Sequence, residues 1–473
     1  MQSSNELDTF FKPRSVCVVG ASRTPGKAGN IILENILANG YQGDVYPVNP
    51  NVDDVLGLRC YPSVRHLPAA PDLVVIAIPA AGVMATVQEC AAQGAKALAI
   101  TTSGFAEWDA AGARLQEELV RIARDAHMRI VGPNTTGLTS TPDRLAATIF
   151  PVGKVPNGSV SIIAQTGNFS GHTLMWMMTV ENIGVCRVAG LGNRIDVDEA
   201  EVLEYFGNDP ETKAIAMYLE GFKNARRFLE VARVVSRRKP LIALKSGRTS
   251  SGIRAVGSHT ASLAGDDAVV DAALGQAGIV RVQTYASLID TIKLLSMQAP
   301  PRGNRVAILT PSGALGIIAA DACERLGLRV GELSADTLGE LQALFPSYIR
   351  VGNPIDVWGA SMVHGTYEAY RRAVRVALAD EGIDVVYCVM IVTPGTVFGS
   401  HEFDPEALSF IPELARQHPD KVVMMALSGR KDHIEAAKSY LEGLSVPVFV
   451  PVEPALEALA HVDRCRQYAT AIP

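Results

Sequence analysis

One pattern recurs along the 473-residue chain and constrains its fold more than any other feature. A short run of apolar residues ends in a turn of small residues, and a segment with apolar residues three and four positions apart follows. Four such units begin the chain, at 16–22, 73–81, 97–104 and 129–137. Continuous apolar strands that alternate with helices predict an α/β fold in which parallel sheets are covered by helices on both faces.

The same pattern returns twice after segments that are rich in proline and glycine. A second series of strands and helices spans 160–248, and a third spans 305–429. We interpret 139–158 and 296–304 as the connections between the series. The chain therefore contains three α/β series rather than one long sheet.

These series predict three domains, because a domain of this class holds about 150 residues. We place a Rossmann-like domain at 1–140 and two flavodoxin-like parallel-sheet domains at 141–300 and 301–473. The last two resemble each other, since Thr166–Ser170 aligns with Ser312–Gly316 after an apolar strand. We interpret this match as a weak internal repeat.

Charge and composition exclude several classes of function. The net charge is −6 and no long basic block occurs, so nucleic-acid binding is not expected. No signal-peptide core and no run of about 18 apolar residues is present, so a membrane span is not expected either. Seven scattered cysteines without metal-ligand spacing predict a reduced, cytoplasmic protein with no metal site of its own.

The first turn, VVGASRTPGKAGN at 18–30, has the features of a diphosphate-binding site. It follows a strand and opens a helix, whose N-terminal N–H groups attract anions. The spacing is not that of a dinucleotide fingerprint, and the second strand ends in Asn49-Pro50 rather than in an acid that would hold a ribose. Ala28 also stands where a P-loop requires Ser or Thr. A purely structural turn is the alternative.

The stretch AVGSHTASLAG at 255–265 carries a histidine, His259, among small residues. We predict a Gly- and Ser-rich loop over 247–265 that lets the backbone approach a charged group. His259 could carry a phosphoryl group if one ring nitrogen is free and an acceptor holds the other. Glu220, at the end of the apolar strand in MYLEGF, is the candidate acceptor. The alternatives are a solvated loop histidine and a structural ion pair.

Donors for the phosphoryl oxygens are expected from the turn AQTGNFSG at 164–171. It begins a helix and offers backbone N–H groups together with the hydroxyls of Thr166 and Ser170. His172 directly follows this turn and is a rival nucleophile. Because His172 falls inside the predicted helix, we interpret it as structural.

Together these motifs resemble the α subunit of the NDP-forming acyl-CoA synthetases, the ADP-forming acetate–CoA ligases of the succinyl-CoA synthetase superfamily. The resemblance runs from about residue 8 to about residue 465 and is strongest over 192–229 and 239–265. It implies that ATP phosphorylates His259 and that Glu220 orients the histidine. The phosphoryl group then passes to a carboxylic acid, and CoA attacks the resulting acyl phosphate. The resemblance also implies a phosphate-binding set: Gln165, Thr166, Gly167, Asn168, Ser258 and Thr260.

The first domain resembles the CoA-binding domain of that family. The matching positions imply these CoA contacts: Gly20, Ala21, Ser22, Lys27, Val48, Asn49, Pro50, Ile78, Pro79, Ser103, Gly104 and Asn134. The chain departs from the family pattern at Asn51, where a lysine is usual, and at Thr135, where a cysteine is usual. Asn51 puts one CoA phosphate contact in doubt, but no departure removes a nucleophile.

The family binds its nucleotide in an ATP-grasp domain, and the three α/β series leave no room for one. The resemblance therefore implies a separate ATP-grasp β subunit that holds ATP or ADP with Mg²⁺, in an α2β2 assembly. CoA and a small carboxylic acid are the expected substrates. The alternatives are a non-catalytic CoA- or acyl-CoA-binding regulatory protein of the same fold and an NAD-linked dehydrogenase, against which Asn49 weighs.

Overall fold

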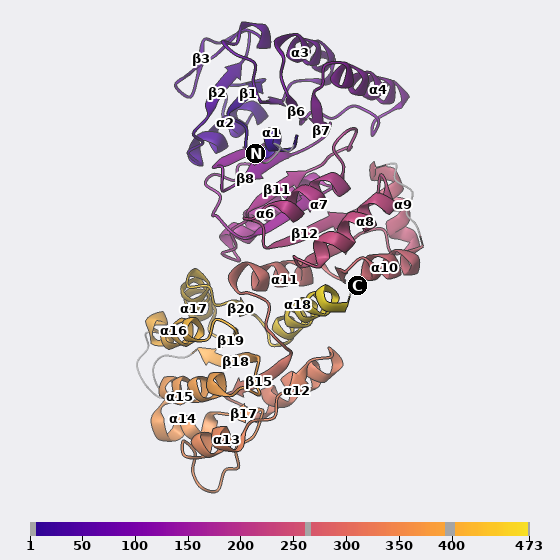
Figure 1. Cartoon of the computed structure of the whole chain (residues 1–473). Helices are drawn as coiled ribbons and strands as arrows, with labels where there is room; N and C mark the ends of the chain where they lie inside the picture. Colours follow the sequence, from indigo (N-terminus) through magenta and orange to yellow (C-terminus); the bar gives the residue numbers. More distant parts are fainter. Residues whose placement is uncertain (1–5, 261–265, 393–402, 472–473) are drawn as a thin grey trace. The chain divides into compact units, whose positions relative to one another are not determined.

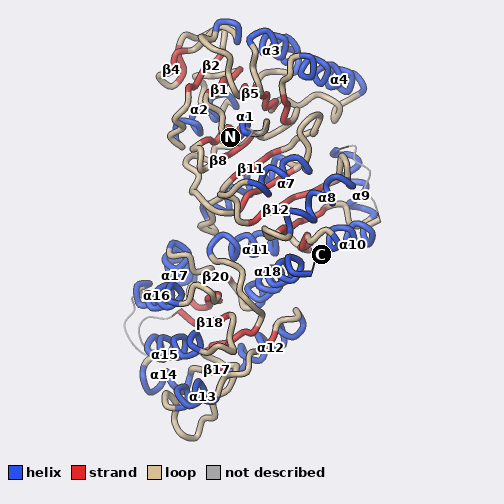
Figure 2. Tube along the Cα trace, in the orientation of Figure 1, coloured by secondary structure: helices blue, strands red, loops and turns tan. Residues whose placement is uncertain are grey.

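A computed structural model describes residues 6–260, 266–392 and 403–471 (Figure 1). The chain divides into two compact units, Met1–Val282 with Tyr468–Pro473, and Gln283–Gln467. In each unit helices pack on sheets built mainly from parallel strands (Figure 2). The predicted α/β class is therefore confirmed.

The first sheet of unit 1 has five parallel strands in the order β2-β1-β5-β6-β7. Its strands are β1 (Ser15–Val19), β2 (Asp44–Val48), β5 (Leu73–Ile76), β6 (Ala97–Ile100) and β7 (Arg129–Val131). Its other elements are α2 (Ala28–Ala38), α3 (Ala80–Gln93), α4 (Ala110–Asp125), the short 3-10 helix η1 (Val64–His66) and the β3–β4 hairpin (Asp54–Val55, Leu58–Arg59). The chain order reverses between β1 and β5, which is where a doubly wound sheet opens a ligand crevice.

The second sheet of unit 1 has the order β14-β13-β12-β10-β11-β8-β9. Its parallel strands are β10 (Val160–Ala164), β11 (Arg187–Gly190), β12 (Ala214–Leu219), β13 (Leu241–Lys245) and β14 (Ile279–Val282). Its helices are α5 (Gly167–Ser170), α6 (His172–Thr179), α7 (Glu199–Asn208), α8 (Ala225–Ser236), α9 (Ser250–Thr260) and α10 (Asp267–Gln276).

The segment 139–158 is more than the connection that its prolines and glycines indicate. The structure places a hairpin there, β8 (Gly137–Ser140) and β9 (Leu145–Thr148), and β8 pairs antiparallel with β11. The interpretation as a plain connection was wrong. The sequence pattern did not reveal the hairpin because its strands consist mostly of small residues. Gly, Ala, Ser and Thr give little hydrophobic periodicity, although both strands are buried.

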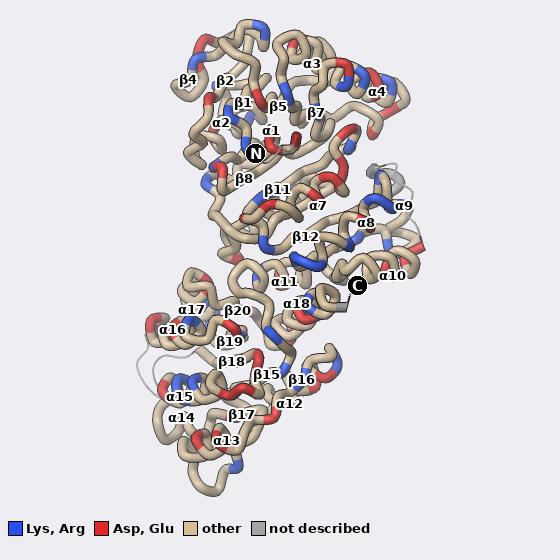
Figure 3. The backbone as a smooth tube through the Cα atoms, in the orientation of Figure 1, with Lys and Arg blue, Asp and Glu red and all other residues tan. Residues whose placement is uncertain are grey.

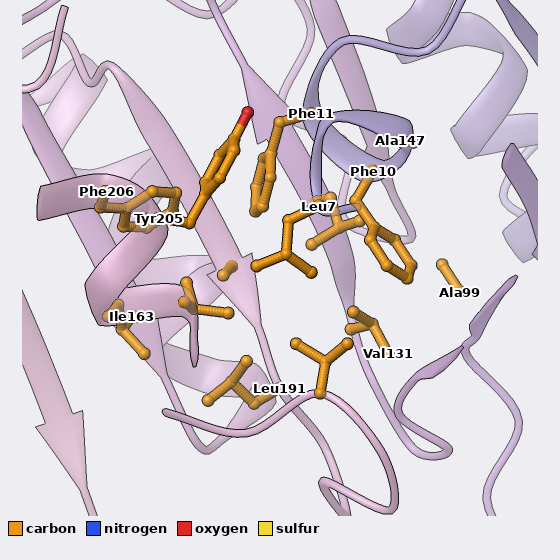
Figure 4. Close-up of a cluster of buried hydrophobic side chains, with 14 of the residues drawn as sticks. Leu7, Phe10, Phe11, Ala99, Val131, Ala147, Ile163, Leu191, Tyr205 and Phe206 are labelled. Atoms are coloured by element: carbon orange, nitrogen blue, oxygen red, sulfur yellow. The ribbon is translucent and has the colours of Figure 1, made fainter. Parts of the chain in front are cut away.

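The two sheets of unit 1 share one hydrophobic core, part of which Figure 4 shows. The short helix α1 (Asp8–Phe11) contributes Phe10 and Phe11, which are fully buried. The Phe11 ring stacks on Tyr205 with 5.2 Å between centroids and meets Phe206 edge-on at 5.2 Å. Side chains from both sheets join this cluster, among them Ala99, Val131, Ile163 and Leu191. The core therefore fixes the first sheet against the second.

We expect Phe11→Ala to lower the free energy of unfolding of unit 1 by about 3–5 kcal/mol, because it leaves a cavity where two sheets meet. Urea unfolding monitored by circular dichroism measures the change. Trp108→Ala is the matched control, since Trp108 is 80% exposed and its loss should cost less than about 0.5 kcal/mol. Equal losses in the two variants would contradict the role of Phe11.

Unit 2 contains one parallel sheet in the order β16-β15-β18-β19-β20, with β17 beside β15. Its strands are β15 (Arg305–Thr310), β16 (Arg329–Val330), β17 (Ile355–Asp356), β18 (Val385–Val392), β19 (Val422–Gly429) and β20 (Val448–Phe449). Its helices are α11 (Tyr285–Met297), α12 (Gly313–Arg325), α13 (Ala335–Gln342), α14 (Trp358–His364), α15 (Thr366–Ala379), η2 (Pro405–Leu408), α16 (Phe410–Gln417) and α17 (Lys431–Gly443). Helix α18 (Glu453–Ala471) begins in unit 2 and ends in unit 1.

The second and third sheets share the arrangement that the internal repeat predicts. In both, the first strand of the series lies between the second strand and a later one: β10 lies between β11 and β12, and β15 lies between β16 and β18. Thr166 precedes α5 and Ser312 precedes α12 at the same place after these first strands.

Helix α18 packs on α11 through a buried histidine, His461, whose Nδ1 lies 3.0 Å from Thr291 Oγ1. Burial is the main cause that lowers the pKa of His461 from 6.5 to about 4. As the pH falls from about 6.5 to 4, the unfolded chain takes up a proton at this residue and the folded chain does not. We therefore expect unit 2 to lose about 3 kcal/mol of stability over this range. Urea unfolding at pH 7.5 and pH 4.5 measures the loss of unfolding free energy, which should be smaller in His461→Gln than in the wild type. Equal losses in the two proteins would contradict the prediction.

Acidic and basic side chains are interspersed along both units (Figure 3), as along α4, where Arg114, Glu117, Glu118 and Arg121 follow one another. In the described part of the chain, no helix has both the length and the apolar character that a bilayer-spanning segment needs. All seven cysteines are buried, and none of them forms a disulfide.

Candidate functional site

A cavity of about 520 Å³ opens at the switch point of the first sheet. Eight of the twelve residues that the sequence predicts for CoA line it: Gly20, Ala21, Ser22, Lys27, Asn49, Ile78, Pro79 and Ser103. Val48, Pro50, Gly104 and Asn134 do not belong to this lining. Val48 nevertheless shapes the turn, because its carbonyl accepts hydrogen bonds from Gly20 N (3.0 Å) and Ala21 N (3.2 Å). The structure thus brings most of the predicted set together at one sheet edge.

Two glycines let the turn pass close to the sheet. Gly20 has a φ of +91°, and a Cβ there would lie 2.3 Å from the Ala77 carbonyl oxygen. A Cβ on Gly29 would lie 2.0 Å from the Gly20 carbonyl oxygen. Helix α2 consequently begins directly against the cavity, with Lys27 exposed at its N-cap position. The N-terminus of an 11-residue helix beside an exposed lysine suits a bound diphosphate.

The side chain of Asn49 is occupied by the protein itself. Its Nδ2 donates to the Ala21 carbonyl at 2.6 Å, and its Oδ1 accepts from Asn51 N at 2.9 Å. Asn49 therefore ties the second strand to the glycine turn. Asn49 is an amide rather than a carboxylate, and both of its polar atoms are engaged within the protein. The geometry therefore does not fit a dinucleotide site of the NAD type, in which a carboxylate here binds the ribose diol.

The sequence missed six of the lining residues: Ala28, Gly29, Ala77, Thr101, Thr102 and Ile149. Gly29 carried a signal, since it follows Gly20 within the same turn. Thr101 and Thr102 donate to the Ile76 carbonyl (2.9 Å) and the Ile78 carbonyl (2.7 Å) and so hold their own loop. Ile149 follows β9 of the second sheet, and no local pattern could assign it to this cavity.

A second cluster lies at the carboxyl ends of β10 and β12. Glu220 follows β12 and is only 4% exposed. The Gln165 Oε1 accepts hydrogen bonds from Glu220 N (2.7 Å) and Gly221 N (3.1 Å), and its Nε2 donates to the Gly221 carbonyl at 2.9 Å. Gln165, predicted as a phosphate ligand, therefore uses its amide to lock the turn that carries Glu220.

Tyr218 connects this turn to helix α5. Its ring stacks on Phe169 with 4.6 Å between centroids. Burial raises the pKa of Tyr218, and the nearby Glu220 carboxylate raises it further. A hydrogen bond with Ser246 acts in the opposite direction and lowers it. Tyr218 thus lies beside Glu220 and remains a neutral hydroxyl at physiological pH.

The other predicted residues of the anion turn lie around the start of α5. Thr166 occupies the N-cap position, and a Cβ on Gly167 would lie 2.7 Å from Thr136 Cγ2. Asn168 Oδ1 lies 3.1 Å from His172 Nδ1. The His172 ring also meets Phe150 edge-on with 4.6 Å between centroids. These contacts fit the structural role predicted for His172.

The predicted loop over 247–265 is wrong for most of its length, because α9 (Ser250–Thr260) is a helix. Thr249 begins it: its Oγ1 accepts from Gly252 N (3.1 Å) and its carbonyl accepts from Ile253 N (2.7 Å). This cap offsets the glycines on which the loop prediction depended. The side chains of Ser258, His259 and Thr260 lie outside the described residues, as does all of 261–265.

The segment that carries His259 nevertheless starts beside Glu220. Strand β13 pairs in parallel with β12, and Ser246 N donates to the Leu219 carbonyl at 3.0 Å. Lys245, at the end of β13, is buried and donates to the Ser246 carbonyl at 2.5 Å. Burial lowers the pKa of Lys245, and the Glu220 carboxylate is among the charges that oppose the shift. Lys245 was not among the residues that the sequence predicts for the site.

In the described residues, no group of three or more His, Cys, Asp or Glu side chains is arranged to hold a metal ion. The two clusters of unit 1 are therefore a cavity beside a helix N-terminus and a buried glutamate on a turn whose backbone is held by the Gln165 amide. The first can bind a phosphorylated ligand, and the second can orient a neighbouring basic group.

Three models of known domain families match the chain. A CoA binding domain matches residues 14–141, a succinyl-CoA ligase like flavodoxin domain matches 157–295, and a ligase-CoA domain matches 306–461. Together they follow the three α/β series in order.

Named relatives are similar over nearly the whole chain. Acetate–CoA ligase [ADP-forming] II of Archaeoglobus fulgidus is 38% identical over 97% of this chain and 67% of its own length. Acetate–CoA ligase [ADP-forming] II subunit alpha of Pyrococcus furiosus is 36% identical over 97% of this chain and 98% of its own. Among solved structures, the dinucleotide forming acetyl-coenzyme A synthetase 1 of Ca. Korarchaeum cryptofilum, in complex with phosphate and ADP, is 33% identical, with a TM-score of 0.90 and 98% of both chains covered.

Proposed function

Because the chain belongs to the ADP-forming acyl-CoA synthetases of the succinyl-CoA synthetase superfamily, we propose that its second sheet carries the phosphohistidine step of acyl-CoA synthesis. The chain is an acid–thiol ligase, and it makes an acyl-CoA from a carboxylic acid, CoA and ATP. His259 and Glu220 are its proposed catalytic residues.

In the proposed cycle, one ring nitrogen of His259 attacks the γ-phosphorus of ATP, and ADP leaves. The Glu220 carboxylate accepts a hydrogen bond from the other ring nitrogen and stabilises the charge on the ring. A carboxylate oxygen of the acid then attacks the phosphorus, which frees His259 and gives an acyl phosphate. The CoA thiolate attacks the acyl carbon, and inorganic phosphate leaves. The reverse sequence makes ATP from ADP.

The cavity of the first sheet is the proposed CoA site. Its glycine turn, the α2 N-terminus and Lys27 suit the diphosphate, and its volume of about 520 Å³ holds part of a CoA molecule. We assign the domains as 1–140, 141–300 and 301–473. Of the four predicted CoA residues outside the lining, Val48 and Asn134 hydrogen-bond to lining residues, and Pro50 and Gly104 directly follow lining residues in sequence.

The nucleotide with Mg²⁺ is proposed to bind to an ATP-grasp β subunit in an α2β2 assembly. Two observations support a separate partner. The three family models account for most of 14–461, and the Pyrococcus furiosus relative of matching length is named subunit alpha. The longer Archaeoglobus fulgidus relative has a third of its length beyond the match. The reduced cysteines suit the cytoplasm as its compartment.

The observation that carries this proposal is the buried Glu220 turn, locked by Gln165 beside the strand that leads to His259. The test is to incubate the chain with its ATP-grasp partner and [γ-32P]ATP. Acid-labile label should appear on this chain and should leave as phosphate when acid and CoA are added. A chain that binds CoA and gains thermal stability but never takes up label would instead be the regulatory protein of the same fold.

A further inference from the structure

Two adjacent residues between β11 and α7, Asn193 and Arg194, lie between the two clusters of unit 1: Asn193 is linked through Glu107 to the loop beside the cavity, and Arg194 contacts the turn after Glu220. We propose that they are positioning residues that couple the occupancy of the CoA cavity to the placement of Glu220. The inference rests on the proposed function only for the identity of the ligand and of the reaction. The contacts themselves are independent of it.

Asn193 reaches the loop beside the cavity. Its Nδ2 donates to Glu107 Oε2 at 2.5 Å and to Gln116 Oε1 at 3.0 Å. The other carboxylate oxygen of Glu107 accepts from Gly104 N (2.7 Å) and Phe105 N (3.2 Å). These amides directly follow Ser103, which lines the cavity. Asn193 therefore holds, through one carboxylate, the loop that a ligand in the cavity would contact.

Arg194 reaches the Glu220 turn from the other side. It is 8% exposed, and its Nη1 donates to the Gly221 carbonyl at 3.0 Å and to Glu199 Oε2 at 2.9 Å. Glu199 is fully buried, and its Oε1 accepts from Lys223 N at 2.8 Å. The turn after Glu220 is thus held by Gln165 on one side and by the Arg194–Glu199 pair on the other.

The backbone between these two side chains is itself constrained. Asn193 N donates to the Pro133 carbonyl at 2.9 Å, and Arg194 has a φ of +56°. A non-glycine residue keeps this left-handed conformation only where its surroundings impose it. Arg194 Nε is also buried with no hydrogen-bond partner among the described residues. A shift of Asn193 should therefore be passed on to Arg194, because the two residues are adjacent on a backbone that its surroundings constrain.

The consequence is a coupling between two sites that share no residue. A ligand that shifts the loop 103–105 acts on Glu107 and Asn193, and through Arg194 on the Gly221 carbonyl. Coupling of this kind is reciprocal, so whatever orders the Glu220 turn also changes CoA affinity. The test therefore measures the effect at one site of a change made at the other.

The first measurement is amide hydrogen exchange of the whole chain with and without saturating CoA. In the wild type, CoA should slow exchange at Glu220 and Gly221 by about five-fold or more, the lower end of ordinary allosteric coupling. In Asn193→Ala, CoA should still slow exchange at the cavity, and its effect at Glu220 should fall below about two-fold. An unchanged effect in this variant, or no effect in the wild type, overturns the proposal.

The second measurement approaches from the other side. Arg194→Lys keeps the positive charge, but its side chain ends one atom short of the Nη1 position that bonds both Glu199 and the Gly221 carbonyl. It should weaken CoA binding about five-fold although Arg194 does not line the cavity. Arg187→Lys is the matched control, because Arg187 is a buried arginine paired with Asp209 at the opposite end of β11. It should lower stability and leave CoA affinity unchanged. Equal CoA affinities in Arg194→Lys and the wild type contradict the coupling.

Labelling with the partner and [γ-32P]ATP separates this proposal from the proposed function. CoA should change the labelling rate of the wild type and not that of Asn193→Ala, with the KM for ATP the same in both. A wild type that binds CoA and never labels refutes the phosphohistidine step, while the exchange data still decide the coupling. If the wild type takes up label and CoA changes the labelling rate of Asn193→Ala by the same factor, the coupling is refuted and the phosphohistidine step is not.

Discussion

Replacement of His259 by alanine should reduce transfer of the γ-phosphoryl group to this chain by about 10³-fold or more, the usual effect of losing a nucleophile. The variant removes the imidazole that accepts the phosphoryl group and leaves Glu220 with nothing to orient. Acyl-CoA synthesis and the reverse formation of ATP should fall by the same factor. Autoradiography of the chain after incubation with its partner and [γ-32P]ATP measures the first effect, and a coupled ADP assay measures the second.

His172→Ala is the matched control for that variant. His172 also neighbours the anion turn, but its ring is engaged by Asn168 and Phe150. It should label at close to the wild-type rate. Label that persists in His259→Ala and disappears in His172→Ala would reverse the assignment of the nucleophile. CoA affinity should be unchanged in His172→Ala, because His172 does not line the cavity.

The second large effect is expected at Gly20. In Gly20→Ala the new Cβ would lie 2.3 Å from the Ala77 carbonyl oxygen, in a backbone conformation with φ +91°. The turn can relieve this contact only by moving away from β5, and the cavity lies between them. A cost of about 3 kcal/mol corresponds to a loss of CoA affinity of about 100-fold or more. Isothermal titration calorimetry with CoA measures it.

Gly26→Ala provides the comparison on the same turn. Gly26 has a similar φ of +81°, and a Cβ there would meet nothing within 4 Å. This variant carries the backbone strain without the contact, so CoA affinity should fall by less than about ten-fold. Similar affinities in the two variants would show that the close approach to Ala77 is not what shapes the cavity.

The sequence predicted those parts of the site that follow from strand ends. In a parallel sheet the carboxyl ends of the strands meet at one edge, so Gly20 after β1 and Ile78 after β5 had to lie near each other. Gln165 was implied only by the resemblance, as a phosphate ligand, and it lies near Glu220 because β10 and β12 are neighbours. The α/β class followed from the same apolar runs.

What the sequence could not predict depends on contacts between distant segments. Ile149 reaches the cavity from the second sheet, and Arg194 reaches Gly221 across a strand, and neither contact leaves a local pattern. Helix α9 was missed for another reason. The loop prediction for this segment relied on its Gly and Ser residues and overlooked Thr249 as a helix cap. The Thr249 side chain accepts a hydrogen bond from Gly252 N in the first turn of the helix. The β8–β9 hairpin was hidden by its small side chains.

The buried cluster around Phe10 and Phe11 also decides how this chain can be divided. If the gene were divided between the first two sheets, Phe11 would be exposed on one fragment and Tyr205 on the other. Both fragments would then expose a hydrophobic surface to water. The two sheets of unit 1 should therefore be kept together when the gene is divided or recombined. A chimaera of relatives that keeps each compact unit whole needs two crossovers, at Val282–Gln283 and at Gln467–Tyr468, where the units meet in sequence.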